Sequence, residues 1–150
     1  MRIVAQRVSH ASVTIEGQVK SSIGPGMMVL LGVEEADTAD DVEWLCGKLS
    51  KLRIFADDND AMNLDITQIG GSFLVVSQFT LHALTKKGNR PSFIRAARPE
   101  HAIPLYELFV KRLHEVSGRE VLTGEFGAMM AVELINDGPV TILMDSKNKE

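Results

Sequence analysis

The stretch Ser72-Phe73-Leu74-Val75-Val76-Ser77-Gln78-Phe79-Thr80-Leu81 decides the fold that this sequence predicts. Its first half is apolar on both faces of an extended chain, which is typical of a strand that is covered on both sides. We therefore expect a central strand rather than an edge strand. Beyond Val76 the two-residue period of a strand places Gln78, Thr80 and His82 on one face. Three polar side chains are thus expected to share one side of the strand end.

Short apolar runs separated by turn residues surround this strand. Before it, strands are predicted at 3–8, 11–15, 19–23 and 27–33, then a helix from Asp37 or Thr38 through Leu52 and a strand at 53–55. After it, a helix is predicted from Pro99 or Pro104 to Ser117-Gly118, followed by strands at 121–123, 128–135 and 140–144. Two helices against many hairpin-linked strands predict one α+β domain over residues 1–145, with a polar, frayed tail at 146–150.

Length and composition limit the classes of protein to consider. A chain of 150 residues buries about 68–70% of its unfolded surface, so a core forms without disulfide bonds or metal. The single cysteine, Cys46, lies in a helical pattern and is expected to be a buried thiol. Charges interrupt the apolar residues at the amino terminus, which predicts neither a leader nor a membrane span and favours a cytoplasmic protein.

Charge is distributed unevenly along the chain. The net charge of −4 argues against general coating of nucleic acid, and DNA is not an expected partner. Acidic residues dominate 34–43, where a helix is expected to begin and its dipole favours negative charge. Basic residues follow the central strand without an intervening acid, at Lys86, Lys87, Arg90, Arg95 and Arg98. This block is either a solvated face or a surface that contacts phosphates.

Conventional catalytic and metal-binding patterns are weak. The four histidines are scattered without a zinc-type pair, and the run Asp57-Asp58-Asn59-Asp60 lacks the glycine and glutamate of a calcium loop. No metal or cofactor is predicted. Thr80 and His82 share a predicted strand face, but residues two apart on a strand are about 6.5–7 Å apart, too far for a simple hydrogen-bonded dyad. At Gly138-Pro139, sequence reasoning alone favours the common trans bond.

Two motifs resemble those of a known family. Ser77-Gln78-Phe79-Thr80-Leu81 and Asn136-Asp137-Gly138-Pro139-Val140-Thr141 are similar to the signature pair of the D-aminoacyl-tRNA deacylases, also called D-tyrosyl-tRNA deacylases. Further matching segments recur in order along nearly the whole chain: Gln6-Arg7-Val8, Ala11-Ser12-Val13-Thr14, Leu30-Leu31-Gly32-Val33, Arg53-Ile54-Phe55, Met62-Asn63-Leu64 and Arg90-Pro91-Ser92-Phe93. No motif position departs from the family pattern.

The resemblance implies a homodimer of barrel-like, mostly antiparallel α+β subunits that hydrolyses the ester joining a D-amino acid to tRNA. Glycine mischarged on alanine tRNA is an implied second substrate. The implied catalytic residues are Ser77, Gln78, Phe79 and Thr80, whose main-chain amides would surround the ester carbonyl, with the adenosine 2′-hydroxyl assisting water. The implied substrate-binding residues are Gly138, Pro139, Phe126 and Met129, with a cis Gly138-Pro139 bond reaching into the partner's pocket to exclude L-amino acids. Lys86, Lys87 and Arg90 would contact the tRNA.

Two other functions remain open at this point. The first is a non-catalytic module that binds the tRNA acceptor end, since a related fold is attached to some archaeal threonyl-tRNA synthetases. The second is a small-molecule esterase that uses Thr80 as its nucleophile. Hydrolysis of charged tRNA would separate a deacylase from the non-catalytic module. The activity of a Thr80→Ala variant would separate it from an esterase that uses Thr80 as its nucleophile.

Overall fold

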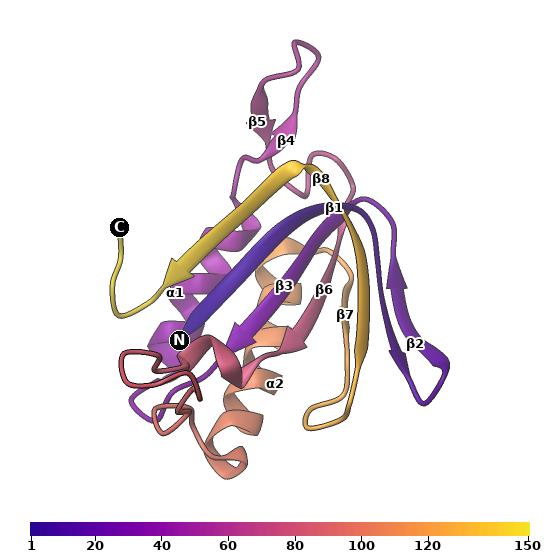
Figure 1. Cartoon of the computed structure of the whole chain (residues 1–150). Coiled ribbons are helices and arrows are strands. Elements are labelled where there is room, and N and C mark those ends of the chain that lie inside the picture. Colours follow the sequence, from indigo (N-terminus) through magenta and orange to yellow (C-terminus); the bar gives the residue numbers. More distant parts are fainter.

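The strand β1 (Arg2–Ile15) organises the sheet in the computed structural model, which describes residues 1–150 (Figure 1). Its first half pairs with β3 (Gly26–Gly32) and its second half with β2 (Gln18–Ile23), both antiparallel. The long strand β8 (Ala131–Asp145) runs antiparallel along the other edge of β1. Because β1 changes partner part-way along, the sheet bends into a nearly closed, barrel-like form. A separate small hairpin consists of β4 (Phe55–Ala56) and β5 (Met62–Leu64).

The predicted central strand is β6 (Ser72–Ser77), and its interior position is confirmed. It lies between β3 and β7 (Val121–Thr123) and is parallel to both. Phe73, Leu74 and Val75 are fully buried, as expected of a strand that is covered on both faces. The sheet is therefore mixed: the pairs made by β1 are antiparallel and the pairs made by β6 are parallel.

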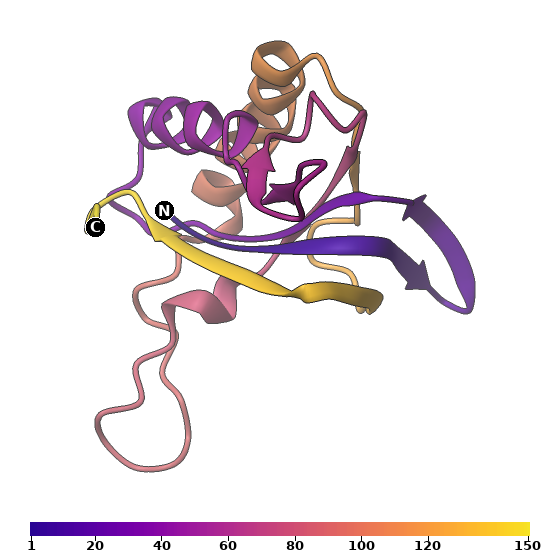
Figure 2. The ribbon, with the colours of Figure 1, turned by 90° about the horizontal axis from the view of Figure 1, so that it is seen from above.

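Both helices lie on one face of the sheet (Figure 2). Thr38 caps α1 (Ala39–Ser50) in a capping box with Asp41. Pro99 opens α2 (Pro99–Ser117), so the helix begins at the earlier of the two predicted prolines, and Pro104 lies inside it. The inner faces contribute buried side chains to the main core, among them Leu45, Leu49, Phe109 and Leu113. In the last turn of α2, Ser117 is buried, whereas the apolar side chain of Val116 is 37% exposed.

Several predicted boundaries were wrong. The predicted strands at 3–8 and 11–15 are one strand, because β8 pairs with β1 on both sides of an irregularity near Val8. Likewise β8 begins at Ala131 rather than 128 and continues through 136–139, which the sequence suggested as an interruption. The most consequential error concerns the end of the central strand. β6 stops at Ser77, and η1 (Phe79–His82) follows as a short 3₁₀ helix.

Smaller features agree with or refine the sequence reading. Cys46 is buried, and burial raises the pKa of its thiol to about 12. In the polar tail, Ser146 is buried, and its backbone amide donates a hydrogen bond of 2.9 Å to the Met1 carbonyl. The tail is therefore anchored where it leaves β8. Neither helix has the length and apolar character needed to span a bilayer.

Candidate active site

A sharp turn follows the central strand and carries the first sequence motif. The Gln78 amide donates to the Leu31 carbonyl at 2.7 Å, which extends the contact between β6 and β3 by one residue. The chain then coils, and Leu81 and Ala83 donate back to the carbonyls of Gln78 and Thr80 at 3.3 and 3.1 Å. Phe79 and Thr80 occupy the first positions of this helix, where amides have no partner inside the turn. We call residues 77–82 the signature turn.

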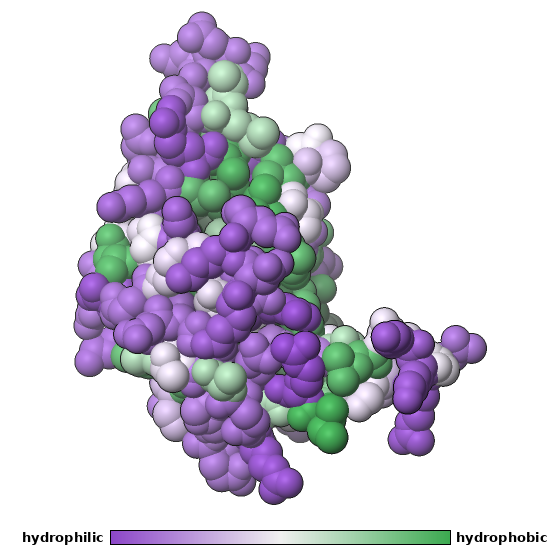
Figure 3. Space-filling model, turned by 90° about the vertical axis from the view of Figure 1, so that its left-hand side faces the viewer, coloured by the Kyte–Doolittle hydropathy of each residue, from purple (hydrophilic) through white to green (hydrophobic).

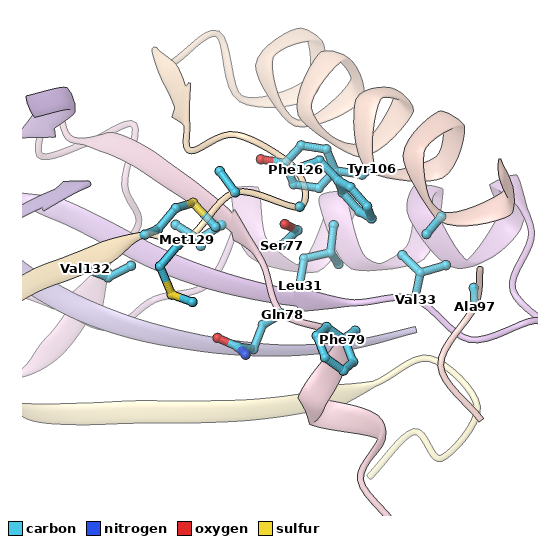
Figure 4. A pocket seen from close by; sticks show the side chains of 15 residues that line it. Leu31, Val33, Ser77, Gln78, Phe79, Ala97, Tyr106, Phe126, Met129 and Val132 are labelled. Carbon is cyan, nitrogen blue, oxygen red and sulfur yellow. The ribbon is translucent and has the colours of Figure 1, made fainter. Parts of the chain in front are cut away.

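A pocket of about 400 Å³ opens beside the signature turn. Ser77, Gln78 and Phe79 form one side of it, and the segment between β7 and β8 forms another through Phe126 and Met129 (Figure 4). The remaining wall is mostly apolar: Leu31, Val33, Val76, Ala97, Ala102, Tyr106, Gly127, Ala128, Met130 and Val132. Five residues that the family resemblance nominated therefore line one cavity, in which apolar surface surrounds a few polar groups.

Tyr106 is a wall residue that the sequence analysis missed. Its hydroxyl donates to the Val75 carbonyl at 2.9 Å, and burial raises its pKa to about 12. Its ring meets Phe126 edge-on, with ring centroids 5.9 Å apart (Figure 4). Tyr106 thus fixes one wall of the pocket to the central strand. A tyrosine on the buried stripe of α2 was the available signal, because a buried tyrosine hydroxyl needs a hydrogen-bond partner.

The polar side chains of the signature turn do not form a nucleophile–base pair. Gln78 Nε2 donates to Thr80 Oγ1 at 2.6 Å. His82 is only 2% exposed, neither ring nitrogen has a hydrogen-bond partner, and burial lowers its pKa. The expectation that Gln78, Thr80 and His82 share one strand face is wrong, because the chain leaves the extended conformation after Ser77. The geometry offers Thr80 no general base in His82.

The second motif lies away from this pocket in the same chain. The Gly138-Pro139 bond is cis, as the resemblance implies and contrary to the general preference for trans. Arg7 adjoins it: Arg7 Nε donates to the Asp137 carbonyl at 3.0 Å, and Nη1 donates to the Ile54 carbonyl at 2.7 Å. Along the sheet, Arg7 pairs with Met27, whereas the signature turn begins beside Leu31. Four residues of strand separate these positions, about 13 Å.

The predicted tRNA-contacting residues lie on a loop that protrudes from the body (Figure 2). This loop, residues 84–98, is called the basic loop below, and Lys86, Lys87 and Arg90 on it are exposed. Leu84 and Ser92 close it with two backbone hydrogen bonds of 2.7 and 3.0 Å. Near the C-terminal end of the loop, Arg95 Nη2 forms a salt bridge with Glu34 at 3.0 Å. The loop therefore projects its three outer cations from an anchored base.

Comparison with known proteins identifies the family. The sequence matches the D-Tyr-tRNA(Tyr) deacylase family over residues 4–145. The chain belongs to this deacylase family. Full-length relatives named D-aminoacyl-tRNA deacylase include proteins of Bacteroides thetaiotaomicron, 65% identical, and Flavobacterium johnsoniae, 59% identical, each aligned over 100% of both chains.

Solved structures share the fold of this chain. One, described as the c-Myc DNA Unwinding Element Binding Protein, is 38% identical, with a TM-score of 0.90 over 97% of this chain and 98% of that one. Another, described as a probable eukaryotic D-amino acid tRNA deacylase, has a TM-score of 0.81 over 95% of this chain and 97% of the other. At 16% identity the second likeness concerns the fold alone.

Proposed function

We propose that this protein hydrolyses the ester bond of D-aminoacyl-tRNA and releases the free amino acid and the tRNA. The observation that carries the proposal is the pocket beside the signature turn, in a chain of the deacylase family. We assign the activity to residues 1–145 and place it in the cytoplasm, where charged tRNA is used. Glycyl-tRNA mischarged on alanine tRNA is a proposed second substrate, because glycine has no side chain by which a chiral filter could reject it.

Backbone donors are the proposed source of catalysis. An aminoacyl ester is an activated bond, and one positioned oxyanion donor typically contributes about 2.7–4 kcal/mol. The amides of Phe79 and Thr80 begin the 3₁₀ turn. Phe79 lines the pocket, and Thr80 is the next residue along the chain. The 2′-hydroxyl of the terminal adenosine is proposed to assist the attacking water. The protein then needs no nucleophile and no cofactor.

Chiral selection is proposed to need a second subunit. Gly138 and Pro139 do not line their own chain's pocket, and about 13 Å of strand separates their neighbour Arg7 from the signature turn. A symmetric partner could present them to the facing pocket. There they would hold the amino group and leave no room for an L side chain, which is selection by exclusion.

Exposed apolar side chains support a homodimer. Met129 beside the pocket is 91% exposed, and Ile135 and Leu143 on the open edge strand β8 are 61% and 68% exposed. Apolar surface interrupts the hydrophilic covering on the side shown in Figure 3. Exposed apolar side chains that gather into one patch are typical of an interaction site.

The decisive experiment measures the release of D-tyrosine and L-tyrosine from charged tRNA. We expect release of the D enantiomer only, at an unchanged rate in the presence of a chelator. Binding of charged tRNA without turnover would instead favour a non-catalytic acceptor-end module. Inhibition by excess duplex DNA is not expected, because the net charge of the protein is −4.

Replacing Thr80 with alanine is expected to leave most of the activity. The hydroxyl accepts a hydrogen bond from Gln78 but has no base to activate it. The measurement is kcat on D-tyrosyl-tRNA, with Thr80→Val as a matched variant that retains the branched shape. A loss of kcat beyond about a thousandfold would restore the covalent mechanism and contradict backbone catalysis.

Charge reversal at Lys87 and Arg90 is expected to raise KM for charged tRNA and to flatten its dependence on salt. Phosphate contacts position the RNA without touching the ester, so kcat should change little. Lys20→Glu, on the exposed part of β2, changes the net charge at a remote site and should leave the salt dependence intact. Equal salt slopes in wild type and the loop variants would show that the basic loop is only a solvated face.

A further inference from the structure

Phe93 links the basic loop to the signature turn. Its ring meets Phe79 edge-on, with centroids 5.1 Å apart and an interplanar angle of 78°. This geometry is a favoured arrangement for two aromatic rings. Phe79 belongs to the turn that borders the pocket, whereas Phe93 follows directly after Ser92, which closes the base of the loop. The pair therefore joins two segments that have different proposed tasks.

The two ends of the signature turn have their own supports. At the start, the Gln78 amide is bound to the Leu31 carbonyl. At the end, Arg2 Nη1 donates to the Leu81 carbonyl at 2.9 Å while Arg2 Nε pairs with Asp145 at 2.8 Å, and His82 is buried. Both anchors act through neighbours of Phe79 and not through Phe79 itself.

The middle of the turn is less enclosed. Phe79 is 55% exposed, and Thr80 is bound to Gln78 within the turn itself. The edge-on contact with Phe93 is thus an external support at Phe79, whose amide is one of the two proposed oxyanion donors. A small rotation there would move that amide away from the ester carbonyl, and misplacement by about 1 Å can cost on the order of a hundredfold in rate.

Phe93 itself has a fixed position. Ser92 and Leu84 exchange backbone hydrogen bonds immediately before it, and the Ala96 amide donates to the Phe93 carbonyl at 3.0 Å. The Ala97 amide then donates to the Val33 carbonyl at 2.9 Å. The ring is therefore mounted on the anchored base of the loop and not on its protruding tip.

We propose that Phe93 is a positioning residue that holds Phe79, and with it the backbone amides of the signature turn, in place from the basic loop. The proposal rests on the proposed deacylase function for its kinetic consequence. Its structural consequence, a rigid signature turn, can be measured independently of any activity.

The test compares Phe93→Ala with Phe93→Tyr, which retains the ring edge. For Phe93→Ala we expect kcat on D-tyrosyl-tRNA to fall about tenfold, which corresponds to the interaction free energy of one aromatic pair. KM should change less than about twofold. Amide hydrogen exchange in residues 78–83 should accelerate about tenfold in the same variant. Phe93→Tyr should be close to wild type in both measurements.

Each contrary outcome is distinct. Unchanged exchange and unchanged kcat in Phe93→Ala would overturn the proposal. A rise in KM alone would make the ring an RNA contact, and loss of the dimer on size-exclusion chromatography would make it an interface residue; either result overturns it too. A wild-type protein that does not hydrolyse D-tyrosyl-tRNA would refute the proposed function, and hydrogen exchange would still decide whether Phe93 holds the turn.

Discussion

Gly138→Ala is expected to reduce kcat/KM on D-tyrosyl-tRNA by about a hundredfold or more. Gly138 has φ of +128°, a conformation that L side chains rarely adopt. A Cβ there would stand 2.8 Å from Arg7 Nη2 and 3.1 Å from the Val140 amide nitrogen. The flexible end of Arg7 can move aside, but the positive φ strains any L residue at this position, so we expect the backbone to shift. A shift of about 1 Å in the proposed substrate-positioning segment would cost on the order of a hundredfold in rate. Initial rates with D- and L-tyrosyl-tRNA measure the effect.

Gly17→Ala is the matched control for Gly138→Ala. Gly17 also has a positive φ, +77°, but a Cβ there meets nothing within 4 Å, and the residue lies in the turn between β1 and β2. Its substitution adds backbone strain far from the pocket and should lower the melting temperature without lowering kcat. If Gly138→Ala retains wild-type rate and selectivity while remaining folded, Gly138 has no part in the site.

Gly32→Val is expected to lower kcat about a hundredfold in a protein that still binds charged tRNA. Gly32 ends β3 directly beneath the signature turn. A Cβ at Gly32 would lie 3.0 Å from the Gln78 carbonyl oxygen and from Leu81 Cβ, and 3.1 Å from His82 Cδ2. Valine adds two further methyl groups, so the turn must move outward and carry its amides with it.

Gly24→Val provides the comparison for Gly32→Val. Gly24 precedes the same strand, and a Cβ there meets nothing within 4 Å. We expect Gly24→Val to have near wild-type kcat. Unfolding temperatures of both variants separate a local effect on the turn from a general loss of stability. A folded Gly32→Val protein with wild-type kcat would refute the role assigned to the amides of Phe79 and Thr80.

The apolar patterns predicted the interior of the fold well. The continuous run from Phe73 to Val76 indicated a strand covered on both faces, and β6 is such a strand. For each helix, one of the two predicted start residues is correct: Thr38 rather than Asp37, and Pro99 rather than Pro104. Capping and proline placement are local preferences, so the sequence narrows the start of a helix to a few residues. The apolar patterns did not predict that β6 pairs in parallel with β3 and β7. The choice of strand partner depends on contacts between residues far apart in the sequence.

The family resemblance predicted part of the pocket lining. Thr80, Gly138 and Pro139 were also predicted as site residues, but they do not line the pocket of their own chain. The motif resemblance brought Ser77, Gln78, Phe79, Phe126 and Met129 to one pocket, which periodicity alone did not. Extending the strand period past Ser77 placed His82 beside Thr80 incorrectly, because a strand can turn into a 3₁₀ helix without a glycine or proline to mark it. Tyr106 and Arg7 act through tertiary contacts, with Val75 and Asp137, that no local pattern contains.

The parallel neighbours of β6 have a consequence for the order of folding. About 40 residues of chain separate β3 from β6, and a similar length separates β6 from β7. Closing such long loops costs entropy before any pairing energy is gained, and contacts of large sequence separation form slowly. The hairpin of β1 and β2 needs only a two-residue turn and can form early. The strand that carries the signature turn is completed on both edges only when residues 121–123 join the sheet. We therefore expect the pocket to be among the last parts of the molecule to become ordered during synthesis.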